Sequence, residues 1–258
     1  MPRFFVDASG SVGDIMLVEG DDALHISKSL RMKPGEEVTL CDGRGTDYRC
    51  ELVKTSGNNA QVRVLEVTQS TSEPSVEITL YASVTKGDKM DIVIQKAVEL
   101  GVSSIVPVLS ERCIYRYDKD SEKNKLARWN KIALEASKQS GRGRIPRVLP
   151  IMPYEQALKE GMIADMRLIA HERAAIPIWE VIESGTYLTS AVFTGPEGGF
   201  TEKEVMAAEG LGYTPISLGN RILRAETAPL CVLSIMIYAA ERDSKKGRLG
   251  SEKEDITI

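Results

Sequence analysis

Two short apolar segments, each running into an unusual loop, constrain the fold of this chain more than any other feature. Residues 191–194 (AVFT) precede the loop GPEGGF at 195–200, and residues 214–218 (TPISL) lead into LGNRILRAETA at 218–228. Glycine at the end of a strand lets the main chain approach a ligand that a Cβ would push away. We therefore expect both loops to line one pocket with backbone amides and carbonyls.

Helices and strands alternate in the part of the chain that holds these loops. The sequence predicts strands at 76–83, 104–108 and 167–170 and helices at 88–100 and 121–140. Asp88 is the predicted N-cap of the first helix and Gly101 its stop. This alternation is typical of an α/β fold with a mostly parallel sheet and helices on both faces.

A helix is predicted directly behind each loop. Thr201 and Glu204 form a capping box after the first loop, and the second helix opens at Thr227 with Pro229 in its first turn. The N-terminus of the first helix suits an anion, but Glu197 inside the loop would repel one and favours a neutral or cationic ligand. A tight turn without a ligand is the alternative.

The N-terminal part of the chain has a different pattern, with short β segments separated by turns. Strands are predicted at 37–41, 48–53 and 60–67, and a helical piece at 21–31. Residues 68–75 are polar, contain Pro74 and form the best linker. We expect a small β domain over residues 1–70, a larger domain over 75–243 and a charged, disordered tail over 244–258.

The charge of the chain is unevenly distributed. The formal net charge of −4 argues, taken alone, against a nucleic-acid partner. Residues 111–147, however, contain 11 Lys and Arg against 5 Asp and Glu. A locally basic segment fits a polyanionic partner, and a solvated helix face is the alternative.

Composition limits other classes of function. Four scattered cysteines show no CxxC spacing and the only histidines are His25 and His171, so we expect neither a metal site nor a disulfide framework. The N-terminus lacks the apolar core of a signal peptide, and no apolar stretch is long enough to cross a bilayer. We expect a cytoplasmic protein that has no contact with a membrane.

Taken together, the two loops resemble the cofactor site of the knotted SPOUT superfamily of S-adenosylmethionine-dependent RNA methyltransferases. More narrowly, the chain resembles the ribosomal RNA small subunit methyltransferase E family, which methylates N3 of a uridine in 16S ribosomal RNA. The resemblance covers nearly the whole chain and includes PRFF at 2–5, LRMKPGE at 30–36, QKAVELGV at 95–102 and EASKQSGR at 135–142. The tail after Asp243 has no counterpart in that family.

The resemblance implies a PUA-like β-barrel for RNA contact over residues 1–70. It implies a second domain that carries a deep trefoil knot and binds S-adenosyl-L-methionine, and a homodimer that acts on 16S rRNA within the small ribosomal subunit. The apolar helix at 230–237 fits burial against a partner subunit, although an ordinary core helix is the alternative.

The resemblance also leads to hypotheses about single residues, with Arg224 and Glu197 as the predicted catalytic pair. Arg224 would stabilise negative charge on the uracil oxygens, unless it serves only in an ion pair with Glu226. Glu197 and Glu172 would face the sulfonium end or the ribose hydroxyls. The residues predicted to bind the cofactor are Leu168, Ile169, Ala170, Glu172, Thr194, Gly195, Pro196, Glu197, Gly198, Gly199, Leu218, Gly219, Ile222, Leu223, Thr227 and Ala228. The residues predicted to contact RNA are Arg3, Lys86, Arg112, Arg142 and Arg144.

Two other functions fit parts of the pattern. One is a non-catalytic RNA-binding factor in ribosome assembly that keeps a vestigial cofactor pocket. The other is a related SPOUT enzyme that acts on another RNA. The intact glycines favour an enzyme, because a dead site has no need of positions without a Cβ. The match at Pro2 and Gln95 favours the uridine-N3 family.

Overall fold

The computed structural model describes residues 1–7, 9–114, 119–183 and 187–254 of the 258-residue chain. It divides into two compact units, Met1–Glu73 with Ser137–Ile145, and Pro74–Ala136 with Pro146–Ile258. None of the described helices combines the length and apolar composition needed to cross a membrane.

Residues 137–145 lie in the first unit, whereas the sequence placed them in the second domain. The Glu73 carboxylate holds this segment by accepting hydrogen bonds from the backbone N–H groups of Gly143 and Arg144, at 2.8 and 3.1 Å. Contacts between residues some seventy positions apart cannot be read from the local pattern of a single sequence.

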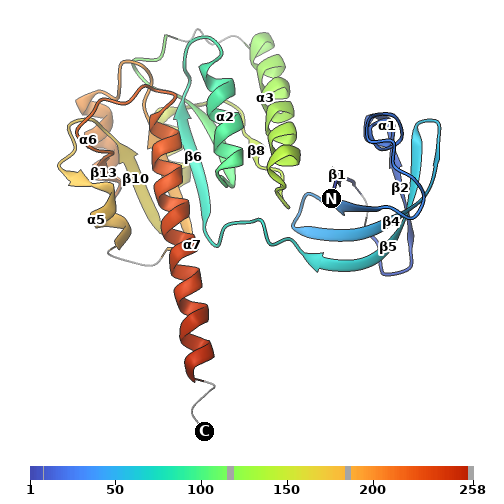
Figure 1. The fold of residues 1–258 in the computed structure, drawn as a ribbon. Helices are drawn as coiled ribbons and strands as arrows, with labels where there is room; N and C mark the ends of the chain where they lie inside the picture. Colours follow the sequence, from blue (N-terminus) through green and yellow to red (C-terminus); the bar gives the residue numbers. More distant parts are fainter. Residues whose placement is uncertain (8, 115–118, 184–186, 255–258) are drawn as a thin grey trace. The chain divides into compact units, whose positions relative to one another are not determined.

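The first unit contains, within its described residues, a five-stranded sheet in the order β1-β3-β4-β5-β2. Its elements are β1 (Arg3–Phe5), β2 (Ile15–Glu19), α1 (Gly20–Leu24), η1 (His25–Ser29), β3 (Glu37–Cys41), β4 (Thr46–Ser56) and β5 (Asn59–Gln69). β1 pairs with β3 in parallel, and the other pairs are antiparallel. Figure 1 shows β4 and β5 side by side in this unit. Alternate strand residues such as Val38, Leu52 and Val62 are fully buried in one core. The predicted strands and helical piece are confirmed, while β1 and β2 were missed.

The second unit is built on a sheet with eight strands among its described residues. The order is β11-β13-β10-β12-β6-β7-β8, with β9 paired to β7. The strands are β6 (Glu77–Ser83), β7 (Ser104–Leu109), β8 (Arg147–Val148), β9 (Met152–Pro153), β10 (Met166–Ala170), β11 (Ile176–Pro177), β12 (Thr189–Thr194) and β13 (Thr214–Ser217). Within the described residues, the strands of this sheet pair in parallel, so the predicted α/β class with a parallel sheet is confirmed.

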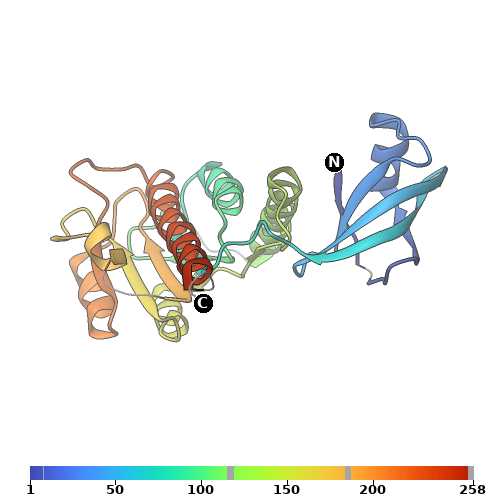
Figure 2. The same ribbon diagram turned by 60° about the horizontal axis from the view of Figure 1, so that its bottom comes forward.

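Helices cover both faces of this sheet. The helices on one face are α2 (Lys89–Glu99), α3 (Lys119–Ser140), α5 (Ile178–Glu183) and α7 (Ala228–Glu254), and those on the other are α4 (Tyr154–Gly161) and α6 (Glu202–Gly210). In Figure 2 the orange helix α6 lies across the sheet from the red helix α7. Successive residues of the central strands point to opposite faces of the sheet, so Val192 and Phe193 of β12 are buried in two different hydrophobic cores.

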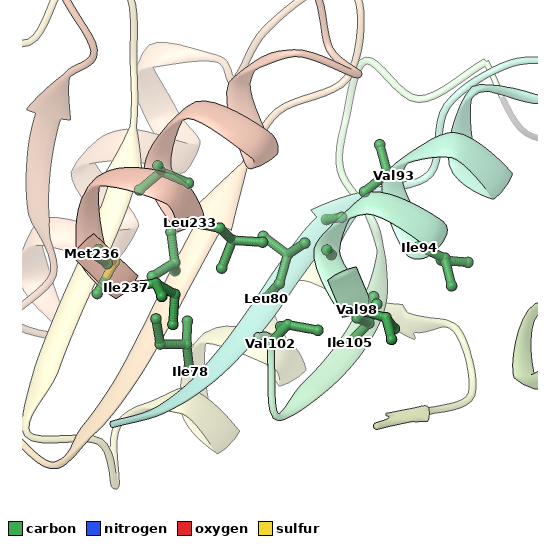
Figure 3. Close-up of a cluster of buried hydrophobic side chains, with 14 of the residues drawn as sticks. Ile78, Leu80, Val93, Ile94, Val98, Val102, Ile105, Leu233, Met236 and Ile237 are labelled. Carbon is green, nitrogen blue, oxygen red and sulfur yellow. The ribbon is translucent and has the colours of Figure 1, made fainter. Parts of the chain in front are cut away.

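The larger core joins β6 to the two helices that lie side by side over it, α2 and α7. Leu80 of β6, Val98 of α2 and Leu233 of α7 meet there and are fully buried (Figure 3). Each such side chain contributes about 1.5–3 kcal/mol relative to exposure. This core fixes the start of α2 and the start of α7, and both border the loops discussed below.

The helices match the sequence predictions at the start of α6 and differ from them at the start of α2 and the end of α7. The capping box of Thr201 and Glu204 is present. Asp88 makes no side-chain cap to α2: its backbone, with φ −89° and ψ 6°, lacks the extended conformation of most N-caps, and its carboxylate lies 3.6 Å from the Arg128 guanidinium. Helix α7 runs to Glu254, into the segment for which disorder was predicted, and the Lys, Glu and Arg residues there are good helix formers.

Candidate functional site

The two glycine-containing loops meet at one edge of the second unit's sheet. Strand β10 lies between β12 and β13 and is parallel to both, so the carboxyl ends of all three strands face the same edge. Ligands of open α/β sheets bind outside such ends. A cavity of about 180 Å³ lies there, lined by Ala170, His171, Glu172, Gly195, Pro196, Glu197, Gly198, Gly199, Leu218, Gly219, Arg221, Ile222, Leu223, Ala225 and Ala228. We call it the loop cavity.

Main chain, rather than side chains, forms much of the loop-cavity wall. A Cβ at Gly195 would lie 3.3 Å from the backbone of Gly199 and Phe200, so the turn closes on itself there. Gly199 has a φ of +68°, and its N–H donates to the Pro196 carbonyl at 2.9 Å. Gly219 has a φ of +110°. Residues with a Cβ rarely adopt such values, which explains why glycine occupies both loops.

Lys89, the first residue of α2, joins the two loops through their carboxylates. Its Nζ lies 3.3 Å from Glu197 Oε1 in the first loop and 3.3 Å from Glu226 Oε2 in the second. Glu197 Oε1 also accepts a hydrogen bond from the Lys86 backbone N–H at 3.2 Å. Two loops from different parts of the chain are therefore tied to one cation outside the cavity lining.

Both carboxylates have a lowered pKa. Burial would raise the pKa of Glu197, but hydrogen bonds from its own backbone N–H and that of Lys86, together with Lys89, hold it below its ordinary value. The pKa of Glu226 is lowered first by a hydrogen bond from its own backbone N–H, against a small desolvation effect, and then by Lys89. Both groups are therefore ionised at neutral pH, and the negative charge of Glu197 borders the cavity.

Arg224 of the second loop points its guanidinium into solvent. Its side chain is 83% exposed, and Nη1 lies 3.9 Å from Glu226 Oε1. Because this ion pair is long and the Arg224 side chain is largely exposed, the guanidinium is accessible to a further ligand.

Most residues predicted to bind a cofactor line the loop cavity, but some do not. Those outside the lining are Leu168, Ile169, Thr194 and Thr227. The side chains of Leu168 and Ile169 are fully buried on opposite faces of the sheet, because successive strand residues alternate. The lining residues that the prediction missed are His171, Arg221 and Ala225. His171 directly follows β10, and its position after a strand end was the available signal.

The structure gives different surroundings to the residues predicted to contact RNA. Arg142 is 3% exposed and donates to the Glu73 carboxylate at 2.7 and 3.0 Å, so it holds its own unit together. Arg3 forms a two-point pair with Asp47. Arg112 donates to the Gly198 carbonyl at 2.7 Å and so supports the first loop. Lys86 and Arg144 are exposed.

The described residues contain no group of three or more His, Cys, Asp or Glu side chains arranged to hold a metal ion. A site walled by main chain and bordered by carboxylates suits a planar, partly cationic ligand.

Two family models match the chain, one in each of its two parts, and residues 137–145, which belong to the first unit, lie within the longer match. Residues 72–237 match the model of the RNA methyltransferase domain, and residues 18–65 match that of the RNA methyltransferase PUA domain. The ribosomal RNA small subunit methyltransferase E of Bacillus subtilis is 32% identical over 93% of this chain and 98% of its own.

Solved structures give the same result. The ribosomal RNA small subunit methyltransferase E of Neisseria gonorrhoeae, determined with bound S-adenosyl methionine, matches with a TM-score of 0.80 and 36% identity over 92% of this chain and 96% of that one. A methyltransferase from Legionella pneumophila, also with bound cofactor, matches with a TM-score of 0.80 and 30% identity over 92% and 97%.

Proposed function

The chain belongs to the family of ribosomal RNA small subunit methyltransferase E, and from this premise we propose that it methylates N3 of one uridine in 16S rRNA. It is an RNA methyltransferase that acts on small-subunit ribosomal RNA and uses S-adenosylmethionine. The observation that carries the proposal is the loop cavity, which lies within the matched domain and is walled by the two glycine-containing loops.

The residues of the loop cavity fit the cofactor. Gly195, Gly198, Gly199 and Gly219 line the cavity without a Cβ, so a planar base can lie against backbone groups. Glu197 and Glu172 border the cavity and complement a cation. S-adenosylmethionine, when bound, supplies an activated methyl group on a sulfonium.

Arg224 and Glu197 have separate roles in this proposal. The exposed Arg224 guanidinium donates hydrogen bonds to the uracil carbonyl oxygens and stabilises the negative charge that develops on the uracil as the N3 proton passes to water. The lowered pKa of Glu197 makes it a poor general base, so its role is electrostatic. The remaining acceleration comes from holding N3 in line with the methyl group.

RNA contact rests on the exposed cations of both units and on the PUA domain. Lys86, Arg112 and Arg144 are exposed and are the candidates, although Arg112 also donates to the Gly198 carbonyl, while Arg3 and Arg142 are engaged by Asp47 and Glu73. Binding to phosphate releases counterions, so affinity for small ribosomal subunits should fall steeply with salt. Affinity that is unchanged between 50 and 200 mM salt would contradict this part of the proposal.

We further propose a homodimer that works in the cytoplasm, where small ribosomal subunits are found. Helix α7 supports the dimer, because it buries Leu233 and Met236 in its own core yet leaves Tyr238 69% exposed. Light scattering on the purified chain should give twice the monomer mass of 28.3 kDa.

The test of the reaction uses small ribosomal subunits from a strain that lacks this gene. The purified chain and isotopically labelled S-adenosylmethionine are added, and nuclease fragments of the 16S rRNA are analysed by mass spectrometry. We expect one fragment to gain one methyl group, on N3 of a uridine. Labelling at another atom, or of transfer RNA instead, would overturn the assignment. Cofactor binding without any labelling would favour the assembly factor.

A further inference from the structure

A second cavity lies beside the loop cavity in the same unit. It has a volume of about 380 Å³ and is bordered by the loop between β6 and α2, by the first turn of α2 and by α3. Its lining shares no residue with that of the loop cavity. The volume is within the range of pockets that enclose small organic ligands.

The wall of this second cavity combines an apolar surface with an aromatic ring. Val84 and Met90 are 2% and 1% exposed and belong to the core beneath it. The Trp129 indole is held in place because its Nε1–H donates to Asp91 Oδ1 at 3.1 Å. Unstacked bases of single-stranded RNA pack against surfaces of this kind.

Both acidic side chains that border the cavity, Asp88 and Asp91, lie close to the Arg128 guanidinium. The Arg128 guanidinium contacts the Asp91 carboxylate and lies 3.6 Å from that of Asp88. Lys86 and Lys125 also border the cavity and leave it with three cationic side chains against two acidic ones. A phosphate next to a packed base would meet these lysines.

The Thr85 hydroxyl is a further polar group of the cavity, and it lacks a hydrogen-bond partner among the described residues. Its side chain is 7% exposed. A buried hydroxyl without a partner costs free energy. A ligand in the cavity is one source of the missing partner.

The second cavity is also connected to the loop cavity. Lys86 borders the second cavity, and its backbone N–H bonds Glu197 of the first loop. Three residues later, Lys89 pairs with both Glu197 and Glu226. A ligand against Lys86 would therefore press on the segment that ties the two loops together.

From these observations we propose that the second cavity binds an unstacked nucleotide of the RNA substrate, one that neighbours the target uridine. The base packs against Ile114, which lines the cavity and is 71% exposed, above a floor formed by the buried Trp129, Val84 and Met90, and its phosphate lies at Lys86 and Lys125. This inference rests on the proposed function, because the loop cavity is taken to hold the methyl donor. It adds a second contact that selects a single-stranded RNA segment.

Crosslinking tests the placement directly. A ten-nucleotide uridine RNA that carries one 4-thiouridine is irradiated with the full-length protein, and crosslinked peptides are identified by mass spectrometry. We expect crosslinks within residues 84–91 or 125–129. Crosslinks confined to other parts of the chain would overturn the proposal. The same experiment with 4-thiouridine monophosphate shows whether a free nucleotide suffices, and we expect far weaker crosslinking from it.

A matched pair of variants on α3 tests the energetics. Lys125→Ala removes a cation that borders the cavity, and Lys123→Ala removes one two residues earlier that is exposed and does not border it. In fluorescence anisotropy with the same RNA, K125A should raise the Kd about fivefold and lower the salt slope by about one. K123A should change the Kd less than twofold. Equal effects of the two variants would contradict the proposal.

These outcomes are separable from the proposed function. If wild-type protein binds S-adenosylmethionine and labels 16S rRNA while K125A and K123A bind RNA alike, only the nucleotide site fails. If the protein shows no cofactor binding but crosslinks at residues 84–91, a site for single-stranded RNA stands, while the methyltransferase assignment and the placement beside a target uridine fail.

Discussion

The two loops of the loop cavity differ in how firmly the protein holds them. The first loop, residues 195–200, is bound from several sides, by Arg112 on the Gly198 carbonyl and by Lys86 and Lys89 on Glu197. The second loop, residues 218–228, is held by Lys89 at Glu226, but it leaves Arg221, Ile222 and Arg224 exposed, with Ile222 86% exposed. The first loop is thus a fixed wall of main chain, and the second offers side chains to a substrate.

This difference separates binding of the cofactor from chemistry on the RNA. Changes in the first loop should weaken binding of S-adenosylmethionine, and changes to exposed side chains in the second should slow methyl transfer. The following experiments test that separation, beginning with the largest expected effect.

Arg224→Ala should lower the methylation rate about 100-fold, because it removes hydrogen-bond donors from the developing charge on the uracil. The Kd for S-adenosylmethionine should stay within twofold of wild type. Single-turnover labelling of small ribosomal subunits gives the rate, and calorimetry gives the affinity. Arg173→Ala, which removes another exposed and ion-paired arginine, is the control and should leave both unchanged. If R224A methylates at the wild-type rate, Arg224 serves only in the ion pair with Glu226 and the catalytic assignment is wrong.

Gly199→Ala should raise the Kd for S-adenosylmethionine about tenfold. The φ of +68° disfavours any residue with a Cβ, and the new atom would lie 3.3 Å from a Glu172 oxygen. Gly210→Ala is the control, because a Cβ at Gly210 meets open space and its φ is not positive. Should G199A bind the cofactor as wild type does, the first loop would not be the fixed wall described above.

Lys89→Ala should raise the Kd for S-adenosylmethionine about threefold, because the two loops lose their shared cation. The matched control is Lys96→Ala on the same helix, because the Lys96 Nζ lies 2.8 Å from Glu99 Oε1 and away from both loops' carboxylates. K96A should bind the cofactor normally. A KM for the cofactor that is equal in K89A and K96A would show that the loops hold their positions without Lys89.

The stabilisation that Lys89 gives through Glu197 and Glu226 should depend on pH only under acidic conditions. The pKa values of Glu197 and Glu226 are lowered from the ordinary 4.5, so the stabilisation they give is fully present above that value and is lost as pH falls through the lowered pKa values. Urea unfolding of wild type and K89A should differ by a constant amount between pH 5 and 8. The difference should shrink below pH 4.5. A difference that changes near pH 7 would point to another titrating group.

Local patterns in the sequence predicted much of this molecule. The capping box at Thr201 and the glycine loops that follow β12 and β13 lie where neighbouring residues alone require them. Strands β6, β7 and β10 were predicted because each is a run of buried, largely apolar residues. The sequence could not show that Asp88 faces Arg128 instead of capping α2, because that contact joins two helices.

The same limit applies to the arginines predicted to contact RNA. Arg142 and Arg3 carry the charge that RNA requires, but Glu73 and Asp47 engage them across long sequence separations. Only the fold distinguishes an arginine that binds its own chain from one that is accessible to a ligand. The trefoil knot implied by the family resemblance stays a prediction.

Binding of S-adenosylmethionine to the purified wild-type chain tests the central claim most directly. Isothermal titration calorimetry should give a saturable heat with a Kd in the micromolar range, and G199A should weaken it while R224A should not. The absence of any binding heat at millimolar cofactor would contradict the claim that these two loops form a methyl-donor site.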